Sequence, residues 1–143
     1  MAALTKDRAT RARTSPYRSS PVAAATTIYA GSLLMRNAAG YIVPGQTATG
    51  LVGVGRAEKN VDNASGAAGE QNIEYLIGTF HFANSSGADE ITIADVGAKV
   101  FAVDDQTVAK TDGSSTRSPA GIVDIVDADG VWIRMDEALT NAS

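Results

Sequence analysis

The chain is organised around the stretch Gly31–Ala57, GSLLMRNAAGYIVPGQTATGLVGVGRA. Short apolar runs on either side of the turn-forming segment 37–40 predict two strands joined as a hairpin. Pro44-Gly45 ends the second strand, and a third strand with interleaved glycines begins at Leu51. Glycine inside a strand is typical of a bulge or a close backbone contact. The stretch predicts a hairpin followed by one more strand, and nothing in it indicates catalysis.

A weaker copy of this plan begins at Gly97. The matching residues keep identical spacing: Gly31, Leu34, Met35 and Ile42 correspond to Gly97, Val100, Phe101 and Val108. After a loop, Gly121–Val126 loosely resembles Leu51–Arg56. The chain is therefore predicted to contain two copies of one hairpin-plus-strand unit.

The remaining segments also read as strands and turns. Asn72–Ala83 is the longest strand expected, and its two apolar faces indicate a central strand or a face covered by another subunit. Glu90–Ala94 and Val131–Met135 are further strands. The best helical candidates, Asp62–Gly69 and Asp136–Asn141, span a turn or two. About eight to ten short strands predict an all-β protein, a small barrel or a sandwich.

Length and composition restrict the class of protein. The 143 residues fit one domain, with an extended basic N-terminal arm (1–24), a β body (25–136) and a short tail (137–143). The chain has no cysteine, which excludes disulfides, thiolate zinc sites and a cysteine nucleophile. We expect no membrane span, because no apolar run approaches the required length of about 20 residues. We expect no cofactor.

Charge is distributed unevenly along the chain. Residues 1–20 hold five basic side chains against Asp7 alone, whereas the remainder holds seven basic and 15 acidic ones. A basic arm on an acidic body indicates that the two parts meet different surfaces, or that the arm of one copy meets the body of another. Nucleic-acid binding is the less favoured interpretation, because the acidic body would repel phosphates.

Residues that resemble catalytic or ligand motifs have simpler interpretations. His81 is the only histidine, and no nucleophile-elbow sequence supplies a serine for it. Asp127–Gly130 resembles part of a calcium loop, but the frame places Ile125 at the first ligand position, so a hairpin turn is favoured. Gly53–Glu58 begins like a dinucleotide fingerprint but lacks the third glycine and a following helix. No metal site is expected.

The aromatic residues divide into two predicted groups. Trp132, Phe101 and Phe80 are expected in the core. Contacts between copies are expected instead at Tyr29, Tyr41 and His81, and tyrosine suits a half-exposed position.

Several glycine-rich and apolar pieces resemble a family of small tailed-phage proteins. The pieces are Gly-Ser-Leu-Leu from Gly31, Tyr41-Ile-Val, Leu51-Val-Gly-Val-Gly-Arg-Ala, Gly97-Ala-Lys-Val-Phe, Ala120-Gly-Ile-Val and Val131-Trp-Ile-Arg-Met. The family consists of capsid decoration (cement) proteins, once described as predicted phage recombinases, and the resemblance covers about residues 25 to 136. No phosphate-binding loop or acidic metal cluster in this chain supports the recombinase description.

The resemblance implies a β-barrel-like subunit on the outer surface of an icosahedral phage head, made in the host cytoplasm, that crosslinks subunits of the major capsid protein. The arm is longer and more basic than a bare barrel needs, which leaves the mode of attachment open. Its expected capsid contacts are Lys6, Arg8, Arg11, Arg13, Tyr17 and Arg18. Closed symmetry would cover exposed strand edges, with a homotrimer favoured over a dimer.

Two other classes of function stay open at the sequence level. A β-sandwich recognition module, carbohydrate-binding or adhesin-like, would need an exposed aromatic platform. A hydrolase would need His81 in a pocket near a serine or an acid.

Overall fold

The computed structural model describes residues 2–143 and confirms the all-β class. The chain forms twelve strands, two short 3₁₀ helices and one short α-helix. The twelve strands, in order, are β1 Tyr17–Pro21, β2 Thr26–Ile28, β3 Leu33–Arg36, β4 Ile42–Pro44, β5 Val52–Ala57, β6 Val61–Asn63, β7 Asn72–Leu76, β8 Gly78–Phe82, β9 Lys99–Ala102, β10 Val108–Ala109, β11 Pro119–Asp127 and β12 Gly130–Met135. The helices are η1 Gly87–Asp89, η2 Ile93–Asp95 and α1 Glu137–Ala142.

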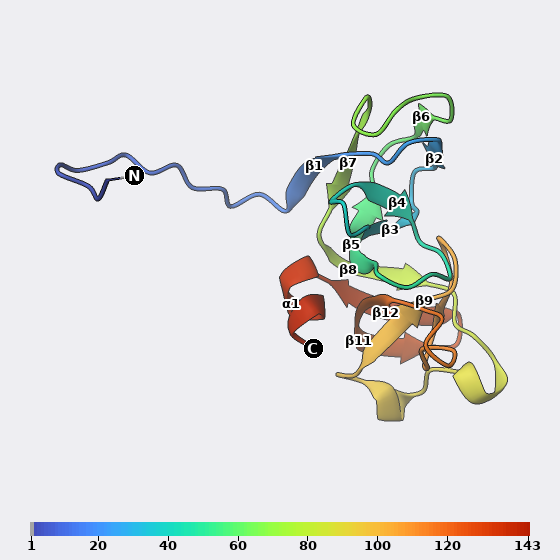
Figure 1. Cartoon of the computed structure of the whole chain (residues 1–143). Helices are drawn as coiled ribbons and strands as arrows, with labels where there is room; N and C mark the ends of the chain where they lie inside the picture. The colour runs from blue at the N-terminus through green and yellow to red at the C-terminus, as the bar shows by residue number, and fades with distance from the viewer. Residues whose placement is uncertain (1) are drawn as a thin grey trace.

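The strands form three antiparallel sheets, and none of the sheets closes into a barrel. The first sheet has the order β1-β7-β5-β3-β4, and the second has the order β10-β9-β11-β12-β8. A small third sheet pairs β2 with β6. Figure 1 shows the first sheet above the second, with the β2–β6 pair at the far end and α1 beside β11 and β12. The arrangement is a sandwich of short strands.

The two large sheets are built on the same plan. Read from β1 and from β8, both sheets have the same strand order and the same chain connectivity, with β1, β7, β5, β3 and β4 equivalent to β8, β12, β11, β9 and β10. The predicted repeat is therefore a property of the whole fold. Residues 17–76 (the first half) and 78–135 (the second half) each supply one sheet.

The pairing register of the two halves matches residue by residue. Leu34 pairs with Gly55, and its match Val100 pairs with Gly121. The register shifts immediately after each of these pairs. This equivalence corrects one expectation: Gly121 corresponds to Gly55, so the predicted alignment of Gly121–Val126 with Leu51–Arg56 was out of register.

Each half has a glycine at the equivalent position, packed against a neighbouring carbonyl oxygen. A Cβ on Gly55 would lie 2.3 Å from the Leu76 carbonyl oxygen, and one on Gly121 would lie 2.6 Å from the Arg134 carbonyl oxygen. No side chain fits at such a distance, so glycine is required at the same place in both sheets. The glycines that looked like a ligand loop are bulged-strand positions.

The first sheet is covered on both faces. On one face, Leu33, Met35 and Val43 pack with residues of the second sheet in one core cluster. On the other face, Leu34 and Tyr75 pack in a second cluster that is closed by the β2–β6 pair. This alternation follows from the period of two along a strand. The second sheet contributes only one face to these clusters.

The expected single strand Asn72–Ala83 is wrong, because the chain divides there between the two sheets. β7 ends at Leu76 and β8 begins at Gly78. Between them, the Ile77 amide donates to the Pro16 carbonyl, and Gly78 has a positive φ of 155°. The two apolar faces seen in the sequence belong to two strands in different layers.

Three smaller expectations have mixed outcomes. Glu90–Ala94 is not a strand, since Thr92 and Asp95 form a capping box that starts η2 instead. Asp62–Gly69 contains no helix. The C-terminal candidate is confirmed as α1, which begins after Asp136, whose carboxylate accepts a hydrogen bond from the Leu139 amide.

The N-terminal arm is a shorter free segment than residues 1–24. β1 begins at Tyr17 and pairs with β7, and Val22 is fully buried. Residues 2–16 extend away from the body (Figure 1). Among residues 2–143, no helix is long and apolar enough to cross a membrane.

Candidate functional site

The arm presents its positive charge to solvent. All residues from 2 to 17 are exposed, including Lys6, Arg8, Arg11 and Arg13. Within residues 2–14, the one hydrogen bond found joins the Thr10 amide to the Arg8 carbonyl, and the first tie to the body is at Pro16. The arm is therefore an extended basic chain whose side chains are all available to a partner.

Two of the six expected capsid contacts lie in the sheet. Tyr17 is 58% exposed on β1, and Arg18 is half-buried. Arg18 also lines a hollow with Tyr75 and Glu137. The extended arm therefore carries Lys6, Arg8, Arg11 and Arg13 one after another, and Arg18 lies where the arm joins the sheet. Arg13 and Arg18 line one hollow with Glu74.

The three expected contacts between copies do not form one surface. Tyr29 is 65% exposed and lines a hollow with Gly31 and Asp105. Tyr41 is half-buried, and its ring lies next to Gly69. His81 is exposed on β8 in the second sheet. The three residues lie in separate parts of the molecule.

His81, Asp127 and Trp132 form a cluster on the second sheet. His81 Nε2 lies 3.2 Å from Asp127 Oδ1, and Trp132 Nε1 donates to Asp127 Oδ2 over 3.0 Å. The two rings are tilted against each other with centroids 5.0 Å apart. Trp132 is 37% exposed, so its expected place in the core was wrong. Phe80 is buried and Phe101 half-buried.

The carboxylate of Asp127 organises this cluster. It accepts hydrogen bonds from the backbone amides of Asp129 and Gly130, each at 2.9 Å. The Asp129 amide, followed by His81 and Trp132, lowers the pKa of Asp127 below its ordinary value. Asp127 pairs with Gly130 across the β11–β12 turn, which confirms the hairpin turn expected instead of a calcium loop.

The cluster does not supply the third member of a hydrolytic triad. Within residues 2–143, the side-chain partner of the His81 ring nitrogens is Asp127, and no serine or threonine hydroxyl hydrogen-bonds to them. The described residues also contain no group of three or more His, Asp or Glu side chains placed to hold a metal ion.

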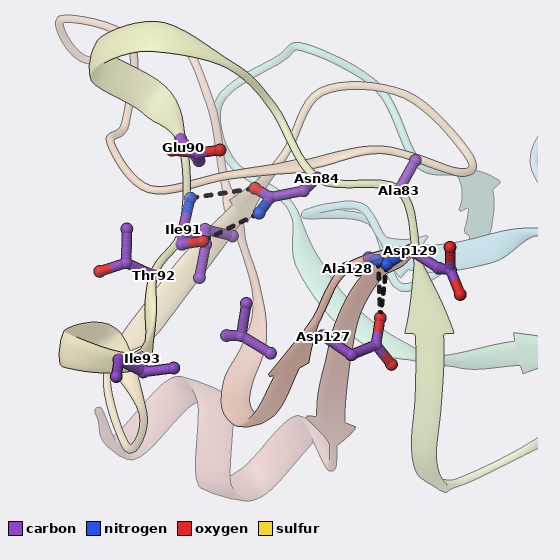
Figure 2. Close-up of a pocket in the computed structure, with 11 residues that line it drawn as sticks. Ala83, Asn84, Glu90, Ile91, Thr92, Ile93, Asp127, Ala128 and Asp129 are labelled. Carbon is purple, nitrogen blue, oxygen red and sulfur yellow. Dashed lines mark hydrogen bonds between the residues drawn. The ribbon is translucent and has the colours of Figure 1, made fainter.

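A groove of about 700 Å³ borders the Asp127 turn. Figure 2 shows its two walls: Asn84 holds the segment around Ile91 on one side, and the Asp127 turn forms the other. The Asn84 amide donates to the Ile91 carbonyl over 2.8 Å and its oxygen accepts from the Ile91 amide. The Asn84 side chain thus takes the place of a backbone strand partner, and the groove is an open surface feature.

The outer face of the second sheet is the exposed surface that sequence reasoning missed. Ile125 on β11 is 53% exposed and pairs with Trp132, which in turn pairs with His81 on β8. A signal was available in the sequence. Trp132 and Arg134 share one face of the strand Val131–Met135, and a charged neighbour on that face indicates exposure.

Comparison with known proteins assigns no family to this chain. No family model, curated protein or solved structure matches it. The function therefore has to be argued from the chain itself.

Proposed function

We propose that the protein is a structural virion protein that binds the outer surface of an icosahedral phage head. It stabilises the head by crosslinking major capsid protein subunits, and it is not an enzyme. The observation that carries the proposal is the exposed basic arm, which projects from an acidic body of short strands.

The geometry of the arm supports attachment to a large acidic protein surface. The 15 residues from 2 to 16 would reach about 50 Å when extended, far enough to leave the footprint of the body. An arm that becomes ordered on binding contacts a large area, although its ordering entropy reduces the affinity. Many copies on one shell turn modest individual contacts into durable attachment.

The body supports the role of a rigid clamp. Its two sheets share a core in which most large apolar side chains are fully buried. Several pieces that resemble decoration proteins form the equivalent strands of the two halves: β3 and β9, and β5 and β11. The resemblance therefore falls on the framework of the fold, and the arm supplies what is particular to this chain.

The proposal is tested on heads assembled from the cognate major capsid protein. Purified full-length protein should co-sediment with the heads at a fixed ratio and raise the temperature at which they break. The triple variant R8Q/R11Q/R13Q should lose binding at least tenfold, because charge contacts to the coat are removed while the body is unchanged.

A matched control removes charge from the body instead. Lys59 and Lys110 are exposed lysines, and the variant K59Q/K110Q should bind heads as the wild type does. Equal binding of the arm variant and the wild type would refute the role of the arm, and no binding by the wild type would refute the proposed function.

One observation favours a second function, a carbohydrate-recognition module. Trp132 is partly exposed with its indole fixed beside His81 and Asp127, and an exposed aromatic ring is what such a module needs. Trp132 is the only tryptophan, so a glycan titration followed by its fluorescence would reveal binding. A flat response across neutral and acidic glycans would remove this alternative.

A further inference from the structure

The outer face of the second sheet carries a continuous row of exposed side chains across three strands. Ile125, Trp132 and His81 are neighbours in the pairing of β11, β12 and β8. On the same face, Arg134 follows Trp132 along β12 and pairs with Ile122. A contiguous apolar face with polar neighbours is typical of a protein-contact surface.

The internal repeat allows this face to be compared with the equivalent face of the first sheet. In the first sheet, the corresponding face is buried against the second sheet through Leu33, Met35 and Val43. Arg56, the counterpart of Ile122, lies with its guanidinium 4.6 Å from the centre of the Phe80 ring. The same architecture therefore covers this face in one half and leaves it exposed in the other.

The charges on the exposed face complement each other. Arg134 and Asp124 are both exposed and line one hollow with Leu139. Neither side chain forms an ion pair within residues 2–143. A twofold axis that passes between Arg134 and Asp124 would bring Arg134 of each copy to Asp124 of the other, since such an interface uses the same patch on both subunits.

Trp132 is already held in place before any partner arrives. Its Nε1 donates to Asp127 and its ring packs on His81. A fixed aromatic side chain loses little conformational entropy on binding, and tryptophan is among the residues that contribute most to protein interfaces.

From these observations we propose that a second copy of this chain docks on the outer face of the second sheet, forming a twofold homodimer. Its axis passes between Asp124 and Arg134, and its interface includes Ile125, Trp132 and His81. Of the two closed arrangements expected from the sequence, this face favours the dimer over the trimer. The inference does not need the proposed attachment to phage heads, since the dimer forms in free solution.

The first experiment measures the mass of the full chain by light scattering over a hundredfold range of concentration. We expect a mass of two chains at high concentration and a dissociation constant at least tenfold weaker for Ile125→Asp. Because Ile125 is exposed, this change should leave the circular dichroism spectrum intact. Thr27→Asp, at an exposed residue of the β2–β6 pair in the first half, serves as the control and should dimerise normally.

The second experiment reverses the charges. Asp124→Arg and Arg134→Asp should each be monomeric, because like charges then face each other across the axis. An equimolar mixture of the two variants should restore dimers, since every cross-axis pair becomes opposite in sign. The emission of Trp132 should shift to shorter wavelength when the mixture assembles.

Three outcomes would overturn the dimer: a monomer at every concentration, a mass of three chains, or a mixture that stays monomeric. Head binding without dimerisation would leave the proposed function standing and remove this inference. Dimerisation without head binding would support this inference and remove the proposed function.

Discussion

The two halves of the molecule share a strand plan but differ at the edge strands β1 and β8. Arg18 and Ser20 of β1 pair with Tyr75 and Ile73, whereas Phe80 and Phe82 of β8 pair with Ile133 and Val131. The two phenylalanines are buried in the main core, but the two polar residues are only half-buried. One edge strand therefore anchors an arm, and its counterpart closes the core.

This difference shows how a repeat can divide its tasks. Backbone pairing and glycine positions are kept in both halves because the bulge and the close carbonyl contact require them. Side chains on the edge strands are free to change, since their environment depends on what covers each sheet. Paired variants at equivalent positions of the two halves test that division.

The largest effect should come from truncating the side chain of Phe80 on β8, which is compared with the equivalent residue Arg18 on β1. Phe80→Ala removes a ring that is 6% exposed within the core and should cost about 3–5 kcal/mol of unfolding free energy. Arg18→Ala, at the equivalent position of β1, should cost less than about 1 kcal/mol. Urea unfolding followed by circular dichroism measures both values. Equal losses would show that the two edge strands contribute alike.

A somewhat smaller loss of unfolding free energy should follow from adding a methyl group at Gly53, where the two halves are in close contact. A Cβ there would lie 1.9 Å from the Ala120 carbonyl oxygen, so backbone must move to admit Gly53→Ala. We expect a cost of about 3 kcal/mol. Gly50→Ala is the control: nothing lies within 4 Å of its Cβ, and only its positive φ of 75° is unfavourable, at about 1 kcal/mol. Equal costs would contradict the close contact.

The hydroxyl of Tyr75 tests a polar feature that the second half lacks. It accepts a hydrogen bond from Arg36 Nη2 over 3.2 Å and lies 3.5 Å from Ser20 Oγ, while the equivalent Ile133 is purely apolar. Tyr75→Phe should therefore cost about 1 kcal/mol in thermal unfolding. Tyr29→Phe, at an exposed tyrosine, should leave the unfolding temperature unchanged, and a neutral Tyr75→Phe would show that the hydroxyl is dispensable.

The smallest effect should be a loss of stability in the second half at low pH. Three carboxyl groups with lowered pKa all lie in the second half: Asp89 through the Thr111 hydroxyl, Asp95 through the Thr92 amide and Asp127 through the Asp129 amide. Their stabilisation is present above the ordinary value of 3.8 and is lost as pH falls through the lower folded values.

Hydrogen exchange at pH 3 and pH 6 would measure this difference. Amides of β11 and β12 should lose more protection on acidification than those of β3 and β5. Asp127→Asn should reduce the difference near the β11–β12 turn, because the variant side chain no longer titrates. A uniform loss of protection in both halves would contradict the assignment.

Much of the fold could be predicted from the sequence, because its signals are local. The apolar run at Leu33–Met35, the turn at 37–40 and the glycines before Ala57 indicated a hairpin and a bulged strand without knowledge of the surroundings. The matching spacing from Gly97 indicated the second copy. The third strands of the two halves could not be aligned correctly from the sequence, since the bulge changes which residue lies opposite the glycine.

The exposed surfaces were predicted less well. Lys6, Arg8, Arg11 and Arg13 were expected on a free arm and lie on one, because a segment poor in large apolar residues has little to bury. Trp132 was expected in the core because large aromatic residues are usually buried. Its exposure depends on which face of the second sheet remains uncovered, and that depends on how the sheets stack.

The amino-acid sequence was enough to predict the all-β class, the repeated hairpin and the separation of a basic arm from an acidic body. These follow from the period of apolar residues, the conformational demands of turns and the order of charges along the chain. The packing of the sheets was needed to see that Asn72–Ala83 divides between two sheets and that Ile125, Trp132 and Arg134 face solvent. Both outcomes depend on contacts between segments far apart in the chain, because burial is a property of the layer that covers a strand.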